Sequence, residues 1–376
     1  MNMMFVEDCC EILDSMRIPI TAIDRKEGEY PYYGANGIQD YVADYIFDDE
    51  LVLLAEDGGN FESKERPIAY RVSGKCWVNN HAHVLKPKVG LDVDYLCYSL
   101  MFYKVDGMVN GATRQKLTQA AMRKMQIPLR CMEEQKHIVD ELNCIIKIKE
   151  QRQQELQLLD DLIKARFVEM FGDLTNPSCA WDRCKLVEAC EEADDIKCGP
   201  FGTQLSKDEY TDTGIAVWEI PQINSSFKTK PTHYLTNEKA EQLRAYSLIP
   251  GDIAMSRKGN VGKCAIYPEE YPDGIIHSDV LRIRVDSKRV NPMFMMRQLH
   301  YSGAVTRQIE LVSSGAIMAG VNVTKLKQIY VHIPPMELQN QFSDFVKQVD
   351  KSKVAVQKSL DETQKLFDSL MQQYFG

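Results

Sequence analysis

Two stretches of the chain carry the same pattern and decide the fold. Residues 132–172 are MEEQKHIVDELNCIIKIKEQRQQELQLLDDLIKARFVEMFG, and residues 336–376 are MELQNQFSDFVKQVDKSKVAVQKSLDETQKLFDSLMQQYFG. The two stretches align without a gap at an offset of 204 residues, from the shared Met-Glu at the start to the shared Phe-Gly at the end. Upstream of them, apolar positions of residues 117–129 also match those of residues 321–333. A repeat of this length predicts two copies of one structural plan.

Each repeated stretch has the spacing of a long amphipathic helix. Neither stretch contains a proline or glycine before its final residue, and intervals of four and three between seam positions are typical of coiled coils. The shared register favours mutual pairing of the helices as an antiparallel coiled coil with a pseudo-two-fold repeat. The alternative is two amphipathic helices that pack separately on globular cores. The seam consists of Ile138, Leu142, Ile145, Lys149, Arg152, Leu156, Leu159, Ile163, Arg166 and Met170, matched by Phe342, Val346, Val349, Lys353, Val356, Leu360, Thr363, Phe367, Leu370 and Tyr374.

A globular segment precedes each helical region. Residues 1–116 and 174–320 mix short apolar runs with turn residues, a pattern that predicts strands and short helices in an α+β globe. The helical regions then cover residues 117–173 and 321–376. Because a globular segment separates the two helices in sequence, an antiparallel pair would place one globe at each end of a rod.

Composition limits the class of protein. The chain has 376 residues, of which 44% are hydrophobic and 26% charged, as in ordinary globular proteins. No apolar run reaches about eighteen residues, so a membrane span is not expected, and the acidic N-terminus does not resemble a signal peptide. The eleven cysteines include no Cys-x-x-Cys pair. This spacing favours reduced thiols in a cytoplasmic protein over a zinc module.

Motifs for catalysis or cofactor binding do not match. The segment 259–264 has some residues of a phosphate-binding loop, but its glycine spacing is wrong and a cysteine replaces Ser or Thr. Asn291-Pro292-Met293-Phe294 lacks the second proline of the Asn-Pro-Pro-aromatic motif of adenine methyltransferases. His81 and His83 could bind a metal, but no carboxylate or cysteine lies near them in the sequence. We therefore expect no active site, no cofactor and no metal.

Polar side chains in both globes have the chemistry needed to contact DNA. Arginine and lysine can bind guanine, asparagine can bind adenine, and glycine lets backbone amides approach phosphates. The alternative for these residues is an ordinary solvated loop. The candidates in the first globe are Asn36, Gln39, Lys64, Arg66, Asn79, Asn80 and His81. Those in the second globe are Gln204, Lys207, Arg257, Lys258, Asn260 and Lys263.

The charge balance argues against strong DNA binding by the isolated chain. The net charge is −9, whereas phosphate contacts need a locally basic surface. Residues 1–116 hold 12 basic and 19 acidic side chains, a net charge of −7, and residues 174–320 hold 17 and 19, a net charge of −2. The second globe is thus better suited to DNA, and the first needs a local basic patch or a basic partner.

Together these features resemble the specificity subunits of type I restriction–modification enzymes. The central region of that family is similar to Ile127-Pro128-Leu129, to residues 132–135 and to residues 159–173. Its target recognition domains are similar to residues 32–38, 56–59, 199–202, 250–253 and 256–262. The resemblance covers nearly the whole chain, and the duplicated globe-plus-helix plan is more specific than any single motif.

The resemblance implies a non-catalytic reader of double-stranded DNA. Each globe would be a target recognition domain for one half of a split, asymmetric site, and the helices would set the distance between the halves. The expected partners are two methyltransferase subunits, which use S-adenosylmethionine to methylate adenine, and restriction subunits that translocate DNA with ATP. A stand-alone DNA-binding regulator and a coiled-coil tether without a nucleic-acid role are the alternatives.

The chain departs from the family pattern where the first helix begins. Arg130-Cys131 stands where the family usually has two prolines, which are present in the second copy as Pro334-Pro335. Leu338 replaces one glutamate of the second motif. These differences bear on how the first helix begins and not on the repeated architecture.

Overall fold

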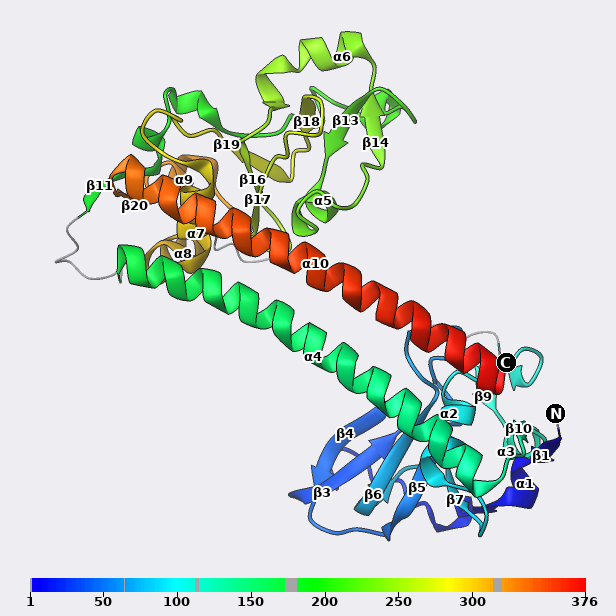
Figure 1. The fold of residues 1–376 in the computed structure, drawn as a ribbon. Coiled ribbons are helices and arrows are strands. Elements are labelled where there is room, and N and C mark those ends of the chain that lie inside the picture. The colour runs from blue at the N-terminus through cyan, green and yellow to red at the C-terminus, as the bar shows by residue number, and fades with distance from the viewer. Residues whose placement is uncertain (1, 64, 112–114, 173–180, 314–319) are drawn as a thin grey trace. The chain divides into compact units, whose positions relative to one another are not determined.

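The computed structural model of the chain describes residues 2–63, 65–111, 115–172, 181–313 and 320–376. The chain forms two compact units (Figure 1). Unit 1 combines Met1–Gln154 with Gln357–Gly376, and unit 2 is Glu155–Val356. Among the described residues, no helix combines the length and the apolar character that crossing a bilayer requires.

Unit 1 is built on a six-stranded mixed sheet. Its strand order is β2-β7-β5-β6-β3-β4. Strand β5 lies inside the sheet, and its residues 51–55 are all buried. Helix α2 (Val93–Met101) packs on β5 and β6 and begins at Asp92, whose side chain accepts from the next turn's backbone N–H groups. The strands are β2 Cys10–Ile12, β3 Glu27–Gly34, β4 Gly37–Val42, β5 Phe47–Ala55, β6 Ala69–Val78 and β7 Ala82–Pro87. Shorter elements are β1 Met3–Phe5, α1 Val6–Cys9, β8 Val109–Asn110, β9 Lys116–Leu117, α3 Gln119–Arg123 and β10 Gln126–Pro128.

Unit 2 contains two four-stranded sheets. The first has the order β12-β19-β16-β17 and the second β14-β13-β18-β15. Apolar side chains of both sheets share one core, while α7 and α8 cover the other face of the first sheet. The strands are β11 Asp182–Lys185, β12 Ile196–Cys198, β13 Ile215–Trp218, β14 His233–Leu235, β15 Ser247–Leu248, β16 Ile253–Ser256, β17 Cys264–Ile266, β18 Gly274–Ile276, β19 Val280–Ile283 and β20 Tyr330–Ile333. The short helices are α5 Ile220–Asn224, α6 Asn237–Gln242, α7 Pro292–Tyr301, α8 Gly303–Val312 and α9 Val323–Leu326.

In unit 1 a buried glutamine fixes the start of the long helix α4 (Met132–Phe171). Gln135 is 1% exposed. Its Oε1 accepts from Asp92 N at 2.8 Å, and its Nε2 donates to Gly90 O at 2.9 Å and Arg130 O at 3.0 Å. The side chain thereby joins the first turn of α4 to the first turn of α2. The antiparallel pair β1–β10 leads into this helix.

Unit 2 repeats this arrangement at the start of α10 (Met336–Phe375). Gln339 is fully buried. Its Oε1 accepts from Asn291 N at 2.8 Å, and its Nε2 donates to Arg289 O at 3.1 Å and Pro334 O at 2.7 Å. The antiparallel pair β11–β20 again leads into the helix. The repeat in the sequence is therefore a repeat in the structure, and the shared glutamine of the two motifs has the same contacts in both units.

The two long helices pair in antiparallel directions within each unit. In unit 1, Tyr374 Oη donates to Glu141 Oε2 at 2.6 Å, and eight residues later on α4 the Lys149 ammonium lies 5.0 Å from the centre of the Phe367 ring. In unit 2, the Lys353 Nζ lies 2.5 Å from Asp160 Oδ1, while the rings of Phe167 and Phe342 are 5.5 Å apart. Numbers rise along α4 as they fall along α10, so the predicted antiparallel pairing is confirmed.

The predicted seam is wrong at the end of α4. Past Ile163 we expected Arg166 and Met170 to continue it, but the structure buries Phe167 and Phe171. Both rings pack against Phe294 of α7 and Phe342 of α10. The buried positions are therefore four residues apart here, instead of the average of about 3.5 residues of the predicted seam. The aromatic rings decide this because they bury more apolar surface than Arg166 and Met170 would. Every residue of α10 that is buried and apolar lies on its predicted seam.

Adjacent residues of α4 allow a test of this packing. Ile163 is fully buried in the core of unit 2, whereas Leu162 is 47% exposed. We expect Ile163→Asp to lower the free energy of unfolding by about 3 kcal/mol or more, because it buries an unpaired charge. Leu162→Asp should change it by less than about 1 kcal/mol. Urea denaturation measures both, and equal effects of the two substitutions would contradict the observed packing.

Candidate nucleic-acid interface

The predicted residues of unit 1 gather at one end of its sheet. Asn36 lies between β3 and β4, while Asn79, Asn80 and His81 lie between β6 and β7. The Asn79 Nδ2 donates to Gln39 Oε1 at 3.1 Å. The Asn36 Nδ2 donates at 2.9 Å to a backbone carbonyl of the segment that follows β5. The fold therefore brings together five of the seven candidate residues of the first globe.

Asn79 and His81 are held by contacts within the protein. Asn79 is buried, and its Oδ1 accepts from His81 N at 2.8 Å, so its side chain shapes the turn. The His81 Nδ1 lies 2.5 Å from Asp57 Oδ1. The carboxylate fixes the orientation of a ring that is half-buried.

Four candidates of unit 1 are exposed to solvent. Arg66 is exposed in the segment that precedes β6. Lys64 lies outside the described residues. The exposed candidates beside the β3–β4 and β6–β7 turns are Asn36, Gln39 and Asn80.

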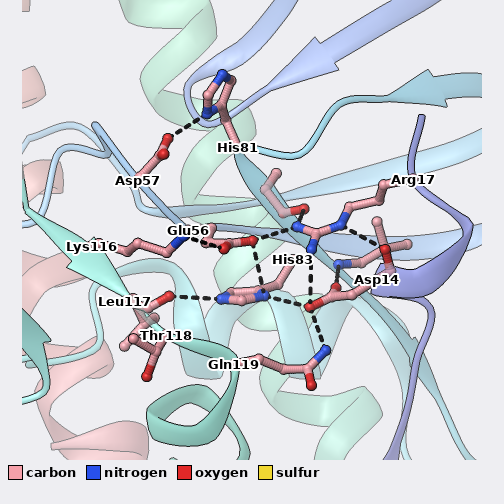
Figure 2. A network of polar contacts seen from close by, with 12 residues as sticks. Asp14, Arg17, Glu56, Asp57, His81, His83, Lys116, Leu117, Thr118 and Gln119 are labelled. Carbon is pink, nitrogen blue, oxygen red and sulfur yellow. Dashed lines mark hydrogen bonds and ion pairs between the residues drawn. The ribbon is translucent and has the colours of Figure 1, made fainter. Parts of the chain in front are cut away.

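A network of buried charged side chains adjoins this end of the sheet (Figure 2). It is continuous with the β6–β7 turn, since Glu56 N donates to His81 O at 2.9 Å. His83 of β7 is fully buried, with its Nδ1 2.7 Å from Asp14 Oδ2 and its Nε2 2.9 Å from Leu117 O. Both ring nitrogens thus lie within hydrogen-bonding distance of an oxygen atom. The network links four parts of the chain that are distant in sequence, around Asp14, Glu56, His83 and Leu117.

Two cationic side chains complete the network. The Arg17 Nη1 lies 2.6 Å from Glu56 Oε2, and its Nη2 lies 3.5 Å from Asp14 Oδ2. The Lys116 Nζ lies 3.0 Å from Glu56 Oε1. Ligand atoms of Asp14, Glu56 and His83 lie within 4.8 Å of one another, as in a metal site. Because Arg17 and Lys116 already neutralise the carboxylates, the network is a structural ion-pair cluster.

This cluster was not predicted from the sequence. We expected no carboxylate near His83, whereas two carboxylates lie within 3.7 Å of its ring in the structure. Asp14 is 69 residues away in the sequence, so no local pattern could have revealed the contact.

The cluster lowers the pKa values of its two carboxyl groups. Burial alone raises the pKa of Asp14, but the hydrogen bond and the charge of His83, with further hydrogen bonds from Gln119 and Val84, leave it below its ordinary value. Burial likewise raises the pKa of Glu56, and the hydrogen bonds from Arg17 and Lys116 lower it by more. Both carboxyl groups therefore stabilise the fold in their ionised form.

In unit 2, Arg257 contributes to the structure of the hairpin loop 257–263 between β16 and β17. Its Nε donates to Val321 O and its Nη1 to Ser278 O, both at 3.3 Å. Its guanidinium also lies 5.5 Å from the centre of the Phe201 ring. Three contacts with three segments hold the base of the hairpin in place.

The outer part of the same hairpin is more accessible. Asn260 and Lys263 are exposed, and the positive φ of Gly259 and Gly262 shapes the turn that carries them. The Lys258 Nζ is paired with Asp279 Oδ1 at 2.7 Å. Among the four predicted residues of this loop, Asn260 and Lys263 are exposed, whereas Lys258 is held in an ion pair and Arg257 contacts the backbone.

A cavity of about 640 Å³ borders this hairpin. Ser278, which Arg257 contacts, is one of its lining residues. Lys207 and His233 also line it, and the His233 ring stacks on Tyr210 at 4.6 Å and pairs with Glu219. Gln204 is exposed nearby, and its Nε2 donates to Tyr246 Oη at 2.8 Å. Of the predicted residues, Lys207 therefore lines this cavity, and Arg257 contacts one of its lining residues.

A family model agrees with the repeat of these two units. The model of the type I restriction modification DNA specificity domain matches residues 1–158 and again residues 197–364. The chain belongs to the specificity subunits of type I restriction–modification enzymes. Each copy of the family domain covers one globe and much of the long helix that follows it.

Two individual specificity subunits are similar to this chain, one along most of it and one along about two fifths. A putative type I restriction enzyme specificity subunit of Haemophilus influenzae is 26% identical over 346 residues, which cover 89% of this chain and 84% of that protein. The putative MjaX specificity subunit of Methanocaldococcus jannaschii is 25% identical over 146 residues, or 38% of this chain and 34% of that protein.

Solved structures share the fold at lower identity. The S subunit of a type I restriction–modification system from M. genitalium has a TM-score of 0.58 and 13% identity, and the match covers 100% of this chain and 96% of that one. A structure described as the basis of complex assembly and conformational transition of the type I R-M system has a TM-score of 0.59 and 14% identity, with coverage of 100% and 97%.

Proposed function

We propose that the chain reads a split, asymmetric DNA site and has no catalytic centre of its own. The observation that carries this proposal is the repeated scaffold with different loops. The contacts of Gln135 and Gln339 are equivalent, whereas a six-stranded sheet stands in one unit and two four-stranded sheets in the other. Two units that share the start of the long helix but differ in their sheets would present different surfaces to DNA, as two different half-sites require.

The exposed polar residues named above are the proposed base-reading groups. In unit 1 they are Asn36, Gln39, Arg66 and Asn80, with His81 oriented by Asp57. In unit 2 they are Asn260 and Lys263, with Gln204 and Lys207 at the neighbouring cavity. Amide and ammonium groups of these types match the hydrogen-bonding edges of adenine and guanine. Asn79, Arg257 and Lys258 would act by holding the loops in shape.

The proposed protein partners are two methyltransferase subunits and ATP-driven restriction subunits, in the cytoplasm. The description of a structural relative refers to assembly of the type I R-M complex. On α4, Leu158 is 59% exposed, Leu162 47% and Val168 48%, and on α10, Val354 is 69% exposed. Apolar side chains in such positions are suited to docking a partner protein. Basic partners would also offset the net charge of −9 during DNA binding.

The rival functions make different predictions. A stand-alone regulator should bind a palindromic site tightly without partners. A coiled-coil tether should show no salt-dependent DNA binding. Neither explains why polar loops of unlike structure occupy corresponding units of the chain.

The test is to map methylated adenines in cells that carry this chain and its methyltransferase partner. We expect a single two-part motif. The double variant Asn260→Ala, Lys263→Ala should relax one half of it, since each good base contact contributes about 1–3 kcal/mol of discrimination. The matched variant Gln39→Ala, Asn80→Ala should relax the other half. A motif that is unchanged in both variants, or a palindromic motif, would contradict the proposal.

A further inference from the structure

The segment Ser225–Pro231 of unit 2, called here the 225–231 loop, has a strained backbone. It connects α5 to β14. Ser226 and Phe227 have φ angles of +52° and +62°, and they are the non-glycine residues with positive φ in the described part of the chain. Two successive residues in this region cost energy, especially for a bulky side chain. Such a conformation persists only where the surrounding structure enforces it.

The side chain of Phe227 enforces this conformation. It is 1% exposed, and its ring lies 5.1 Å from the rings of both Trp218 and Tyr267. The Tyr271 hydroxyl donates to the Phe227 carbonyl at 3.1 Å. The aromatic core of unit 2 therefore fixes the middle of the loop.

Hydrogen bonds fix the remainder of the loop. Phe227 N donates to the Gln222 carbonyl at 2.7 Å, and the buried Gln222 side chain donates through Nε2 to Lys230 O at 3.0 Å. The Ser225 hydroxyl oxygen accepts from Thr229 N at 3.1 Å. With both ends tied to α5, the loop presents its outer side chains from a defined backbone.

Those outer side chains are cationic and hydroxylic. Ser226, Lys228, Thr229 and Lys230 are exposed. The chain has no acidic residue between Glu219 and Glu238. Lysine, serine and threonine are among the side chains that contact DNA phosphates, and such contacts set position without reading bases.

The loop adjoins both parts of the candidate interface in unit 2. On one side, the Ser256 hydroxyl at the base of the 257–263 hairpin donates to Asn224 Oδ1 at 3.3 Å. On the other side, the loop leads into His233, which lines the cavity with Lys207. A duplex read by the hairpin would therefore have its backbone next to the 225–231 loop.

We propose that the 225–231 loop binds the sugar–phosphate backbone of DNA through Lys228 and Lys230 and so positions unit 2 for base reading. The proposal rests on the DNA-reading function proposed above. The loop contributes affinity that falls with salt and does not change the sequence recognised, because phosphates are the same at every base pair. The strained backbone fixes the positions from which both lysine side chains project before DNA arrives, which reduces the ordering cost of binding.

The test compares variants of the full chain assembled with its methyltransferase partner. DNA affinity is measured at several salt concentrations by fluorescence anisotropy. For Lys228→Ala, Lys230→Ala we expect the slope of log affinity against log salt to become shallower by about two, roughly 0.9 per lost phosphate contact. The methylated motif should stay the same. Lys288→Ala is the control, since Lys288 is an exposed lysine on the turn before α7 that pairs with Glu191.

Three results would overturn the proposal. If the double variant keeps the wild-type slope, the lysines do not touch phosphates, while the DNA-reading function stands. A changed motif would show that the loop reads bases. If the wild-type complex shows no sequence-dependent binding, the proposed function fails and this inference fails with it. Thermal unfolding of the double variant, expected to match the wild type, excludes misfolding as the cause of a shallower slope.

Discussion

Removal of one heptad from each long helix is expected to shorten the spacer between the two half-sites by up to about three base pairs. Residues 150–156 of α4 lie between the Lys149–Phe367 and Lys353–Asp160 contacts, as do residues 359–365 of α10. Their deletion leaves both contacts and the apolar register in place. Seven residues of helix span about 10.5 Å, and DNA rises about 3.4 Å per base pair. Mapping methylated adenines in cells measures the new spacer.

Loss of all methylation would also agree with this role of the helices. Three base pairs turn the duplex by about a third of a helical turn. The two half-sites would then face different directions around the duplex, and the two units could fail to bind both at once. Deletion of the heptad from α4 alone is the control, and it should destabilise the chain because the seam loses its register. Full methylation of the original site by the double deletion would show that the helices do not set the spacing.

Asp14→Asn is expected to lower the free energy of unfolding by about 3–5 kcal/mol, as removal of one partner from a buried ion pair does. Asp14 is buried, and its Oδ2 accepts from His83, from Gln119 Nε2 at 2.9 Å and, as an ion pair, from Arg17 at 3.5 Å. Asparagine has nearly the same shape but no charge, so Arg17 loses one of its two carboxylate partners and keeps only Glu56. Urea denaturation of the chain at pH 7 measures the loss.

The effect of this substitution should depend on pH in one direction. The folded protein lowers the pKa of Asp14 from its ordinary value of 3.8. Its ionised form therefore stabilises the fold fully above that value, and this stabilisation is lost as the pH falls through the lowered pKa. The difference between wild type and variant should shrink on acidification.

Asp40→Asn provides a matched control for the buried pair. The Asp40 carboxylate pairs with Arg25 at 3.1 Å, but its side chain is 46% exposed. We expect a much smaller loss than for Asp14→Asn, because exposed ion pairs contribute little to stability. Equal losses for Asp14→Asn and Asp40→Asn would show that the cluster beside the β6–β7 turn does not stabilise unit 1.

The repeat and the helices were predictable because their signals are local. Apolar residues at fixed spacing mark Ile138, Leu142 and Ile145 on α4 without knowledge of what they contact. The seam prediction was wrong at Phe167 and Phe171 because tertiary packing of aromatic rings, which spacing does not encode, decides which face is buried there.

The candidate sites could be predicted only in part. Turn residues such as Asn36 and Asn80 are visible in the sequence as polar residues beside glycine or between strands. The contact of His83 with Asp14 joins segments that are far apart in sequence, and the order of the strands was equally beyond local patterns. The positive φ of Phe227 was not predictable, since aromatic residues rarely adopt it and only the surrounding core explains it.

The division of the chain into units has a consequence for its synthesis on the ribosome. Unit 2 is one continuous segment, Glu155–Val356, whereas unit 1 needs both Met1–Gln154 and Gln357–Gly376. Phe367 and Leu370 belong to the same core as Leu142 and Ile145. The globe of unit 1 is therefore translated before unit 2 but completed after it, once residues 357–376 have left the exit tunnel. A stop codon that removes residues 357–376 would damage a globe encoded about 200 codons earlier.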